Sequence, residues 1–165
     1  MNRITKAGLA LAMMIAGTVP AFSHAVGLHF IAAPDASGGG YGPALTFKLN
    51  GIPFVFGVDF SIHGNDVSLG VTADQWMIHE KITDDLPLMW GLGWGAYGYI
   101  GMSDKTSISF GGRFPLFIDA YFRDGTLEPF LQIVPSVGLA IAPILNFPDW
   151  AIPVSIGMRY WFDEP

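Results

Sequence analysis

Residues 54–63 read FVFGVDFSIH, and their apolar side chains fall on every second position. The even positions are Phe54, Phe56, Val58, Phe60 and Ile62, whereas the residues between them are mostly small or polar. Successive side chains of a β-strand point to opposite sides, so a period of two indicates a strand with two different faces. The stretch therefore predicts a strand with one uniformly apolar face.

The same alternation recurs along the chain and predicts eight strands in all. The other segments are 28–32, 45–49, 67–74, 88–97, 108–122, 127–137 and 152–162. Turn residues separate several of them, at Asn50-Gly51, Gly64-Asn65-Asp66, Ser103-Asp104-Lys105 and Asp124-Gly125. Eight strands of about ten residues match the smallest outer-membrane barrels. We predict an all-β fold, an eight-stranded antiparallel up-and-down transmembrane β-barrel.

Composition suits a membrane protein, because 51% of the residues are hydrophobic and only 13% are charged. The two long uncharged runs make poor helices. Residues 86–103 contain Pro87 and five glycines, and residues 129–148 contain four prolines. A glycine costs a helix interior about 1 kcal/mol and a proline costs more. A closed barrel is the remaining way to cross a bilayer.

Alternation alone also fits a soluble barrel, so the prediction depends on which face is inside. The polar face has many Gly, Ser and Thr and few charges, which suits a crowded lumen better than a soluble surface. Pro115, Pro129, Pro135 and Pro153 fall within the predicted strands, and a closed barrel has no free edge for a residue without an N–H. Bulges or shorter strands are the two ways to accommodate them.

The first residues have the features of a secretory signal peptide. Arg3 and Lys6 precede an apolar run from Leu9 to Gly17, and small residues lead to Ala25. The run is shorter than the roughly 20 residues of a spanning helix. We predict that residues 1–25 are a signal peptide cleaved after Ala25, and that residues 26–165 form the barrel of a bacterial outer-membrane protein.

Charge and residue usage exclude several kinds of site. Two of the eight basic residues lie in the leader, which leaves six against 14 acidic residues and a formal charge of −8. This balance argues against nucleic acid, whose phosphates need Lys and Arg clusters. The chain has no Cys, and His29, His63 and His79 lack metal-ligand spacing. Gly38-Gly39-Gly40 lacks the Lys of a phosphate loop. We expect no cofactor and no metal.

The inward face carries charges of both signs. The predicted lumen ion network contains Lys48, Asp59, Asp74, Arg113, Asp119, Glu128 and Arg159. The interior of an eight-stranded barrel is just wide enough for side chains to fill, and buried ions must pair. Glycines of the strand at 88–96 would make room for Arg113 and Tyr121. We predict a lumen plugged by salt bridges; the alternative is a narrow channel or proton path.

An enzymatic alternative rests on one strand. Asp59, Ser61 and His63 share a face, and some small outer-membrane barrels are lipid-modifying enzymes that use Ser, His and an acid. Alternation produces this spacing automatically, so we predict that the protein is not an enzyme.

Successive connections of an up-and-down barrel lie at alternate ends. The outward loops, at the end opposite the chain termini, are therefore predicted at about residues 34–41, 63–66, 102–106 and 138–150. The last contains Leu139 to Trp150, which is mostly apolar and could fold over the rim, extend the barrel wall or bind an extracellular partner. Candidates for interfacial aromatic girdles are Trp76, Trp90, Trp94, Trp150, Tyr160 and Trp161, of which Trp76 and Trp161 lie on the inward face and would instead pack the lumen.

The second half of the chain, 86–162, resembles a family of small spirochaetal outer-membrane barrels that are similar to OmpX/OmpA-type eight-stranded barrels. The resemblance rests on LPLMWGLG (86–93), GRFPL (112–116), LEPFLQIVP (127–135) and IGMRYWF (156–162), in the family's order. Met89 and Trp90 replace the usual aromatic pair, and Gln132 stands where an acid is common. The aromatic last strand resembles the signal read by the barrel assembly machinery, although three residues follow Phe162. The resemblance implies a fold and a location, but no catalytic residue or substrate.

The sequence therefore favours a structural or surface-exposed outer-membrane barrel that contacts lipid and serves envelope integrity or host contact. A narrow channel, a lipid-modifying outer-membrane enzyme and a soluble periplasmic barrel remain the alternatives.

Overall fold

The computed structural model describes residues 23–34, 40–63, 66–102, 106–142 and 144–162. Most of the predicted signal peptide and the turn residues at 64–65 and 103–105 lie outside this part. The described residues contain no helix that is long and apolar enough to cross a membrane.

The strands are β1 (Ser23–Ala33), β2 (Gly40–Leu49), β3 (Phe54–His63), β4 (Asp66–Lys81), β5 (Leu88–Met102), β6 (Ser107–Arg113), β7 (Leu116–Ala120), β8 (Leu127–Ile133), β9 (Ser136–Ala142), β10 (Asn146–Ala151) and β11 (Val154–Trp161).

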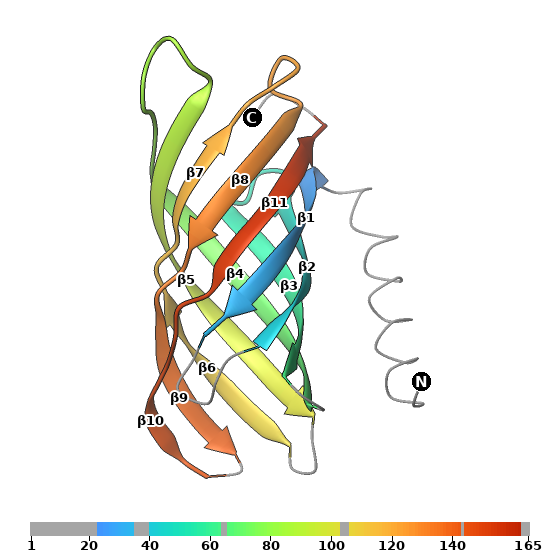
Figure 1. Ribbon diagram of the computed structural model, residues 1–165, viewed down its shortest axis with the longest axis vertical. Coiled ribbons are helices and arrows are strands. Elements are labelled where there is room, and N and C mark those ends of the chain that lie inside the picture. Colours follow the sequence, from blue (N-terminus) through green and yellow to red (C-terminus); the bar gives the residue numbers. More distant parts are fainter. Residues whose placement is uncertain (1–22, 35–39, 64–65, 103–105, 143, 163–165) are drawn as a thin grey trace.

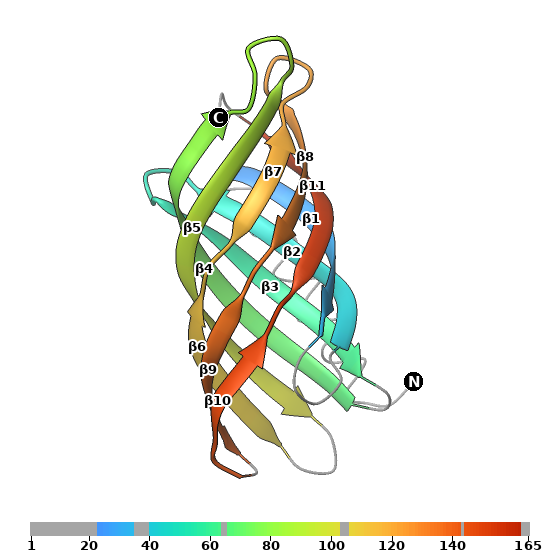
Figure 2. The ribbon, with the colours of Figure 1, turned by 60° about the vertical axis from the view of Figure 1, so that its left-hand side comes forward.

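The eleven strands form eight spans of one closed antiparallel sheet (Figures 1 and 2). Strand β5 pairs with β6 through residues 95–101 and with β7 through residues 88–92, so β6 and β7 are two halves of one span. Strands β8 and β9 are likewise halves of one span, as are β10 and β11. The pairing of β7 with β5 closes the ring, and the predicted eight-stranded antiparallel barrel is confirmed.

Prolines on neighbouring spans explain the three divisions. Pro115, Pro135 and Pro153 separate the halves, and the residue before each proline donates its N–H to a proline carbonyl on the adjoining span. The N–H groups that the prolines lack lie in one row across neighbouring spans, so the hydrogen-bond ladder is interrupted at this row alone. Beyond the row, the apolar face of each span still points outward and the other face still points into the lumen. The row of backbone hydrogen bonds, at 2.7–3.0 Å, runs from Gly93 to Pro115, from Phe114 to Pro135, from Val134 to Pro153 and from Ile152 to Pro34.

Pro129 is accommodated differently, inside β8. It pairs with Met158 of β11, while the ladder between β7 and β8 ends one residue away at Asp119 and Phe130. Three strand prolines are therefore explained by shorter strands and the fourth by a ladder that stops beside it.

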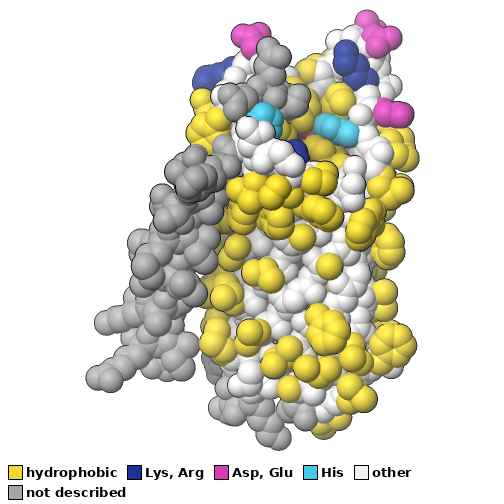
Figure 3. Space-filling view, turned by 180° about the vertical axis from the view of Figure 1, so that it is seen from behind, with side chains coloured by type: hydrophobic (Ala, Val, Ile, Leu, Met, Phe, Trp, Pro, Cys, Tyr) yellow, Lys and Arg dark blue, Asp and Glu magenta, His cyan; other side chains and the backbone are white. Residues whose placement is uncertain are grey.

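The two faces of the sheet are placed as predicted. On β3, Phe54, Phe56 and Val58 are half-buried on the outer surface, whereas Val55 and Asp59 are buried in the lumen. The outer wall is apolar on all sides of the barrel, with side chains such as Leu28, Val71 and Ile156 at least 59% exposed. On the face seen in Figure 3, charged side chains gather at one end, and hydrophobic side chains are spread over the wall below them. The outside of the barrel is therefore the apolar side.

The ends of β1 and β11 that carry the chain termini lie at one end of the barrel, which we call the terminal end. The turns between β2 and β3, β4 and β5, and β7 and β8 lie there too (Figure 1). Asn50-Gly51 and Asp124-Gly125 form turns as predicted, with Gly51 at a φ of 74° and Gly125 at 88°. Both angles favour glycine, because it has no Cβ to clash in the left-handed region.

The expected outward loop at 138–150 is mostly strand. Strand β9 runs to Ala142 and β10 starts at Asn146, and the two pair from Asn146 with Ala140 to Ala151 with Ser136. The prediction of a long loop is therefore wrong, and extension of the barrel wall, one of the three alternatives, is what the structure shows. The apolar composition follows from this, because the outer face of a barrel wall is apolar throughout.

Candidate functional site in the barrel lumen

Six of the seven charged residues assigned to the lumen are buried in it. They are Asp59, Asp74, Arg113, Asp119, Glu128 and Arg159, each at most 7% exposed. Lys48 is a correction to the predicted network. It is half-exposed at the rim, where its Nζ donates a hydrogen bond of 2.8 Å to the carbonyl oxygen of Ile52 in the turn after β2. Its long flexible side chain reaches the solvated turn, which avoids burying the ammonium group.

The layer nearest the terminal end is built around Glu128 and Arg159, which face each other on β8 and β11. The Arg159 guanidinium donates a hydrogen bond to Glu128 Oε1, and the Trp161 indole donates one of 2.5 Å to Oε2. The guanidinium carbon also lies 4.0 Å from the ring centre of Phe130 and 5.2 Å from that of Trp76. Both charges are thus paired and enclosed by aromatic rings, which favours an immobile plug.

A hydrogen-bonded histidine–carboxylate pair lies beside this layer and was not predicted. His79 Nε2 is 3.0 and 2.9 Å from the two carboxylate oxygens of Asp119. Tyr121 stands next to His79, with ring centres 6.0 Å apart, just after β7 and outside the strands. Burial, together with the carboxylates of Glu128 and Asp119, raises the pKa of the Tyr121 phenol, so its hydroxyl stays protonated.

A β-bulge places His79 in the lumen. Trp76 pairs with Gly93 and Ile78 with Leu92, so Met77 is an extra residue on β4. Simple alternation from the inward Asp74 and Trp76 would turn His79 outward, and the bulge reverses this. The residues around Met77 contain no Gly, Pro or other signal of a bulge. Only the alignment of β4 with β5 reveals the change of register.

The next layer lies near the middle of the barrel. Tyr99 donates a hydrogen bond of 2.5 Å to Asp59, and Arg113 Nε lies 3.1 Å from Asp74 Oδ1, an ionic contact without the angle of a hydrogen bond. Between the layers lies a cavity of about 10 Å³, enough for roughly one water molecule. The lumen is therefore filled from the terminal end to its middle.

Glycines provide the room for these side chains. A Cβ on Gly91 would meet the Phe117 ring, and one on Gly95 would meet the Asp74 carboxylate. Glycines of β5 thus make room in the lumen as predicted, but at Gly91 and Gly95 they do so for Phe117 and Asp74 rather than for the predicted Arg113 and Tyr121.

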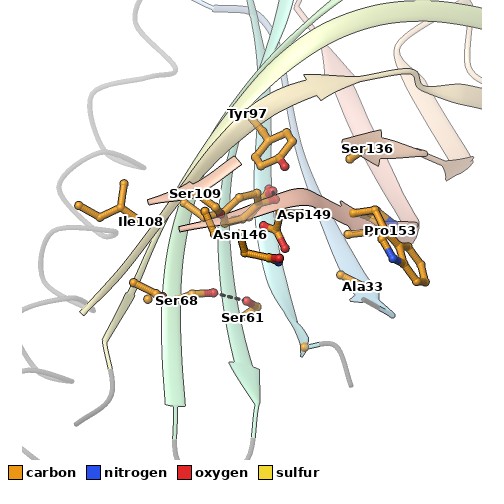
Figure 4. Close-up of a pocket in the computed structure, with 18 of the residues that line it drawn as sticks. Ala33, Ser61, Ser68, Tyr97, Ile108, Ser109, Ser136, Asn146, Asp149 and Pro153 are labelled. Atoms are coloured by element: carbon orange, nitrogen blue, oxygen red, sulfur yellow. Dashed lines mark hydrogen bonds between the residues drawn. The ribbon is translucent and has the colours of Figure 1, made fainter. Parts of the chain in front are cut away.

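The half of the lumen beyond Asp59 holds a cavity of about 480 Å³ (Figure 4), which we call the cup. Its lining includes serine hydroxyls from β3, β4, β6 and β9. Ser61 Oγ lies 2.5 Å from Ser68 Oγ, and the His63 side chain that the enzymatic alternative needs lies outside the described residues. The described residues contain no group of three or more His, Cys, Asp or Glu side chains that could hold a metal ion.

The aromatic residues divide between the two faces. Trp90, Trp94, Trp150 and Tyr160 are 36–47% exposed on the outer surface. Trp161 is buried in the lumen, and Trp76 packs there against Phe117, with ring centres 4.8 Å apart. Trp76 and Trp161 are thus lumen-packing residues rather than members of a girdle.

Two solved structures share this architecture. The crystal structure of neisserial surface protein A (NspA) superposes with a TM-score of 0.52 at 16% identity, covering 84% of this chain and 95% of that one. The N-terminal β-barrel domain of Pseudomonas aeruginosa OprF gives a TM-score of 0.51 at 11% identity, covering 84% and 99%. No protein-family model and no curated protein matches the sequence.

At these identities the likeness concerns the fold. The chain shares the eight-stranded barrel fold of these two structures, and its predicted resemblance to OmpA/OmpX-type barrels is a likeness of fold. The narrower resemblance to spirochaetal barrels stays a prediction.

Proposed function

We propose that this protein is a non-enzymatic, surface-exposed barrel of a bacterial outer membrane, with a lumen closed by its own side chains. The observation that supports this best is the plug. Among the described residues, Glu128 and Arg159 neutralise each other, His79 faces Asp119, and Arg113 faces Asp74, and these side chains occupy the terminal half of the lumen. A structural role in the envelope fits a barrel of this kind better than transport does.

The outer surface supports a membrane location. Leu28, Phe30 and Ile156 are at least half exposed, which would be unfavourable in water and is favourable in lipid. The terminal end would face the periplasm, where a barrel with an even number of strands keeps both ends of its chain. Export would use residues 1–25 as a cleaved signal peptide. Cleavage after Ala25 would leave β1 starting at Val26, which pairs with Phe47 and Tyr160.

The tip between β9 and β10 is the part proposed to contact an extracellular partner. Ile144, Leu145 and Phe147 are 69–78% exposed there, beyond the last residues of β9. Exposed apolar groups at an outward tip suit contact with another apolar surface. Replacing all three with Ser should leave folding unchanged and weaken only such contact, because the three side chains pack against little.

Fractionation and gel mobility test the membrane barrel. The protein should sediment with outer membranes, and the detergent-extracted form should migrate differently before and after boiling, because a closed barrel resists SDS until it is heated. Recovery in the soluble periplasmic fraction without a heat-dependent shift would contradict the proposal.

Conductance in planar bilayers tests the closed lumen. Purified protein should add no discrete steps above those of a bilayer treated with detergent alone. Reproducible single-channel steps would show a continuous pore and would favour the channel alternative.

A further inference from the structure

Strand β1 begins inside the predicted signal peptide. It starts at Ser23, three residues before Val26, which is the predicted first residue of the mature chain. Ser23 and Ala25 both pair with β2, and Ala25 also pairs with Trp161 of β11. Figure 1 shows this start of β1 beside the end of β11. Residues 23–25 therefore occupy a place in the barrel wall between two neighbouring strands.

The first residues of β1 also contact the plug. Ala25 is fully buried, and the carbonyl oxygen of His24 accepts a hydrogen bond of 3.0 Å from the N–H of Phe162. The His24 ring lies edge-on to the Trp161 ring, with ring centres 5.4 Å apart. Trp161 is the residue whose indole donates a hydrogen bond to Glu128. The start of β1 thus covers the layer of the plug nearest the terminal end.

Cleavage after Ala25 would remove these contacts from the mature barrel. It would also leave a new N-terminal ammonium group on Val26, which is half-buried and pairs with Phe47 of β2 and Tyr160 of β11. An α-amino group is mostly charged at neutral pH, whereas the amide that it replaces is neutral. Placing such a charge within the wall is unfavourable. A cut at this point therefore fits the sequence pattern but not the finished wall.

The sequence offers a second cut four residues earlier. Residues 19–21 read VPA and residues 23–25 read SHA, so both triplets end in Ala and begin with a short uncharged residue. Both are of the kind that signal peptidase reads. Either cut leaves the positive start and the apolar run from Leu9 to Gly17 in the removed segment. The leader alone does not choose between them, whereas the barrel favours the earlier one.

We infer that signal peptidase cuts this chain after Ala21, so that the mature protein starts at Phe22 and keeps the whole of β1. The peptidase acts on the exported chain before the barrel forms, so burial of Ala25 does not itself prevent the later cut. What decides is that the mature wall uses residues 23–25. The inference rests on the proposed export to the outer membrane and changes only the position of the cut given there.

N-terminal sequencing tests this on protein isolated from the outer membrane of a Gram-negative bacterium that expresses the full precursor. We expect the sequence Phe-Ser-His-Ala-Val, which starts at Phe22. A chain that starts at Val26, or at any other residue after Met1, would overturn the inference and leave the proposed membrane barrel unaffected. A chain that keeps Met1 would contradict the proposed cleavage of the leader as well.

Two precursor variants locate the cut independently. Ala21→Leu places a bulky residue directly before the inferred cut and should abolish the start at Phe22. Ser23→Leu makes the same change two residues before Ala25, where it would disturb only the later cut, and should leave the start at Phe22 unchanged. A start at Phe22 that persists in Ala21→Leu, or one that is lost in Ser23→Leu, would overturn the inference.

Refolded barrels compare the two mature forms directly. Chains of residues 22–165 and 26–165 are folded in the same detergent and then unfolded in urea. The longer form should unfold at a higher urea concentration, because only it retains the carbonyl of His24 that bonds Phe162 and the buried side chain of Ala25. Equal midpoints would show that residues 23–25 add nothing to the wall and would overturn the inference.

Discussion

At the scale of single residues, Glu128 and Arg159 depend on each other. Both are almost fully buried, and Trp161 completes the hydrogen bonding of the carboxylate. Glu128→Ala leaves the Arg159 charge buried without its partner, which should lower the free energy of unfolding by about 3–5 kcal/mol. Urea unfolding of the detergent-bound barrel, followed by tryptophan fluorescence, measures the loss.

Lys48→Ala is the comparison for this variant. It removes a hydrogen bond at the rim and should cost about 0.5–1.5 kcal/mol. The double replacement Glu128→Gln with Arg159→Met should recover part of the loss, because neither buried charge remains. If Glu128→Ala costs no more than Lys48→Ala, the ion pair does not hold the plug together.

The glycines of β5 allow a second prediction at this scale. A methyl group on Gly91 would meet the Phe117 ring inside the lumen, whereas one on Gly98 would meet nothing within 4 Å. Gly91→Ala should therefore destabilise the barrel by about 1–3 kcal/mol through overpacking. Gly98→Ala should be neutral or slightly stabilising, since glycine weakens a strand interior. Equal effects in the same urea assay would mean that the lumen is not tightly packed.

At the scale of the elements, the bulge at Met77 decides which way the end of β4 faces. It places Met77 and Ile78 on the outer side in succession and turns His79 inward. The chain has no Cys, so single cysteines can report this arrangement. Cysteines at 77 and 78 should both react with an apolar maleimide in detergent, while a cysteine at 79 should react slowly. Reaction at 77 and 79 but not at 78 would indicate regular alternation without a bulge.

The same element shows what the sequence can and cannot predict. Alternation placed both faces of the eight predicted segments correctly, because burial of one face depends only on the local period of two. It missed His79, since a bulge becomes visible only when β4 is aligned with β5. Lys48 was assigned to the lumen network only because it falls on the inward positions of its strand. That pattern does not say how far a flexible side chain reaches.

The prolines lay beyond prediction for a related reason. Pro115, Pro135 and Pro153 are far apart in sequence, and each looked like a defect in its own strand. They share a row only once the register of three neighbouring spans is known. The cup is also a property of assembled strands, because its serines come from four of them.

At the scale of the whole molecule, the barrel combines a closed half and a hollow half. Charged and aromatic side chains fill the lumen near the terminal end, and serine hydroxyls, two tyrosines and apolar side chains line the cup beyond Asp59. Both halves share one apolar outer wall. The division places the packed part of the lumen and its large cavity at opposite ends of one barrel.

A membrane barrel requires the apolar face of every strand to meet lipid, and Trp76 and Trp94 test this at matched depth. Trp76 pairs with Gly93, and Trp94 pairs with Gln75, so the two lie on adjacent rungs of the β4–β5 pair. Trp94 is 46% exposed on the outside, whereas Trp76 packs in the lumen against Phe117.

The direct measurement is tryptophan quenching by brominated lipids. Two variants, reconstituted in vesicles of lipid brominated on the acyl chains, each retain one of these tryptophans and carry Phe at the other four. Fluorescence of the variant with Trp94 alone should be strongly quenched, and that of the variant with Trp76 alone should be nearly unchanged. Equal quenching of both, or stronger quenching of Trp76, would contradict the placement of the apolar face in lipid.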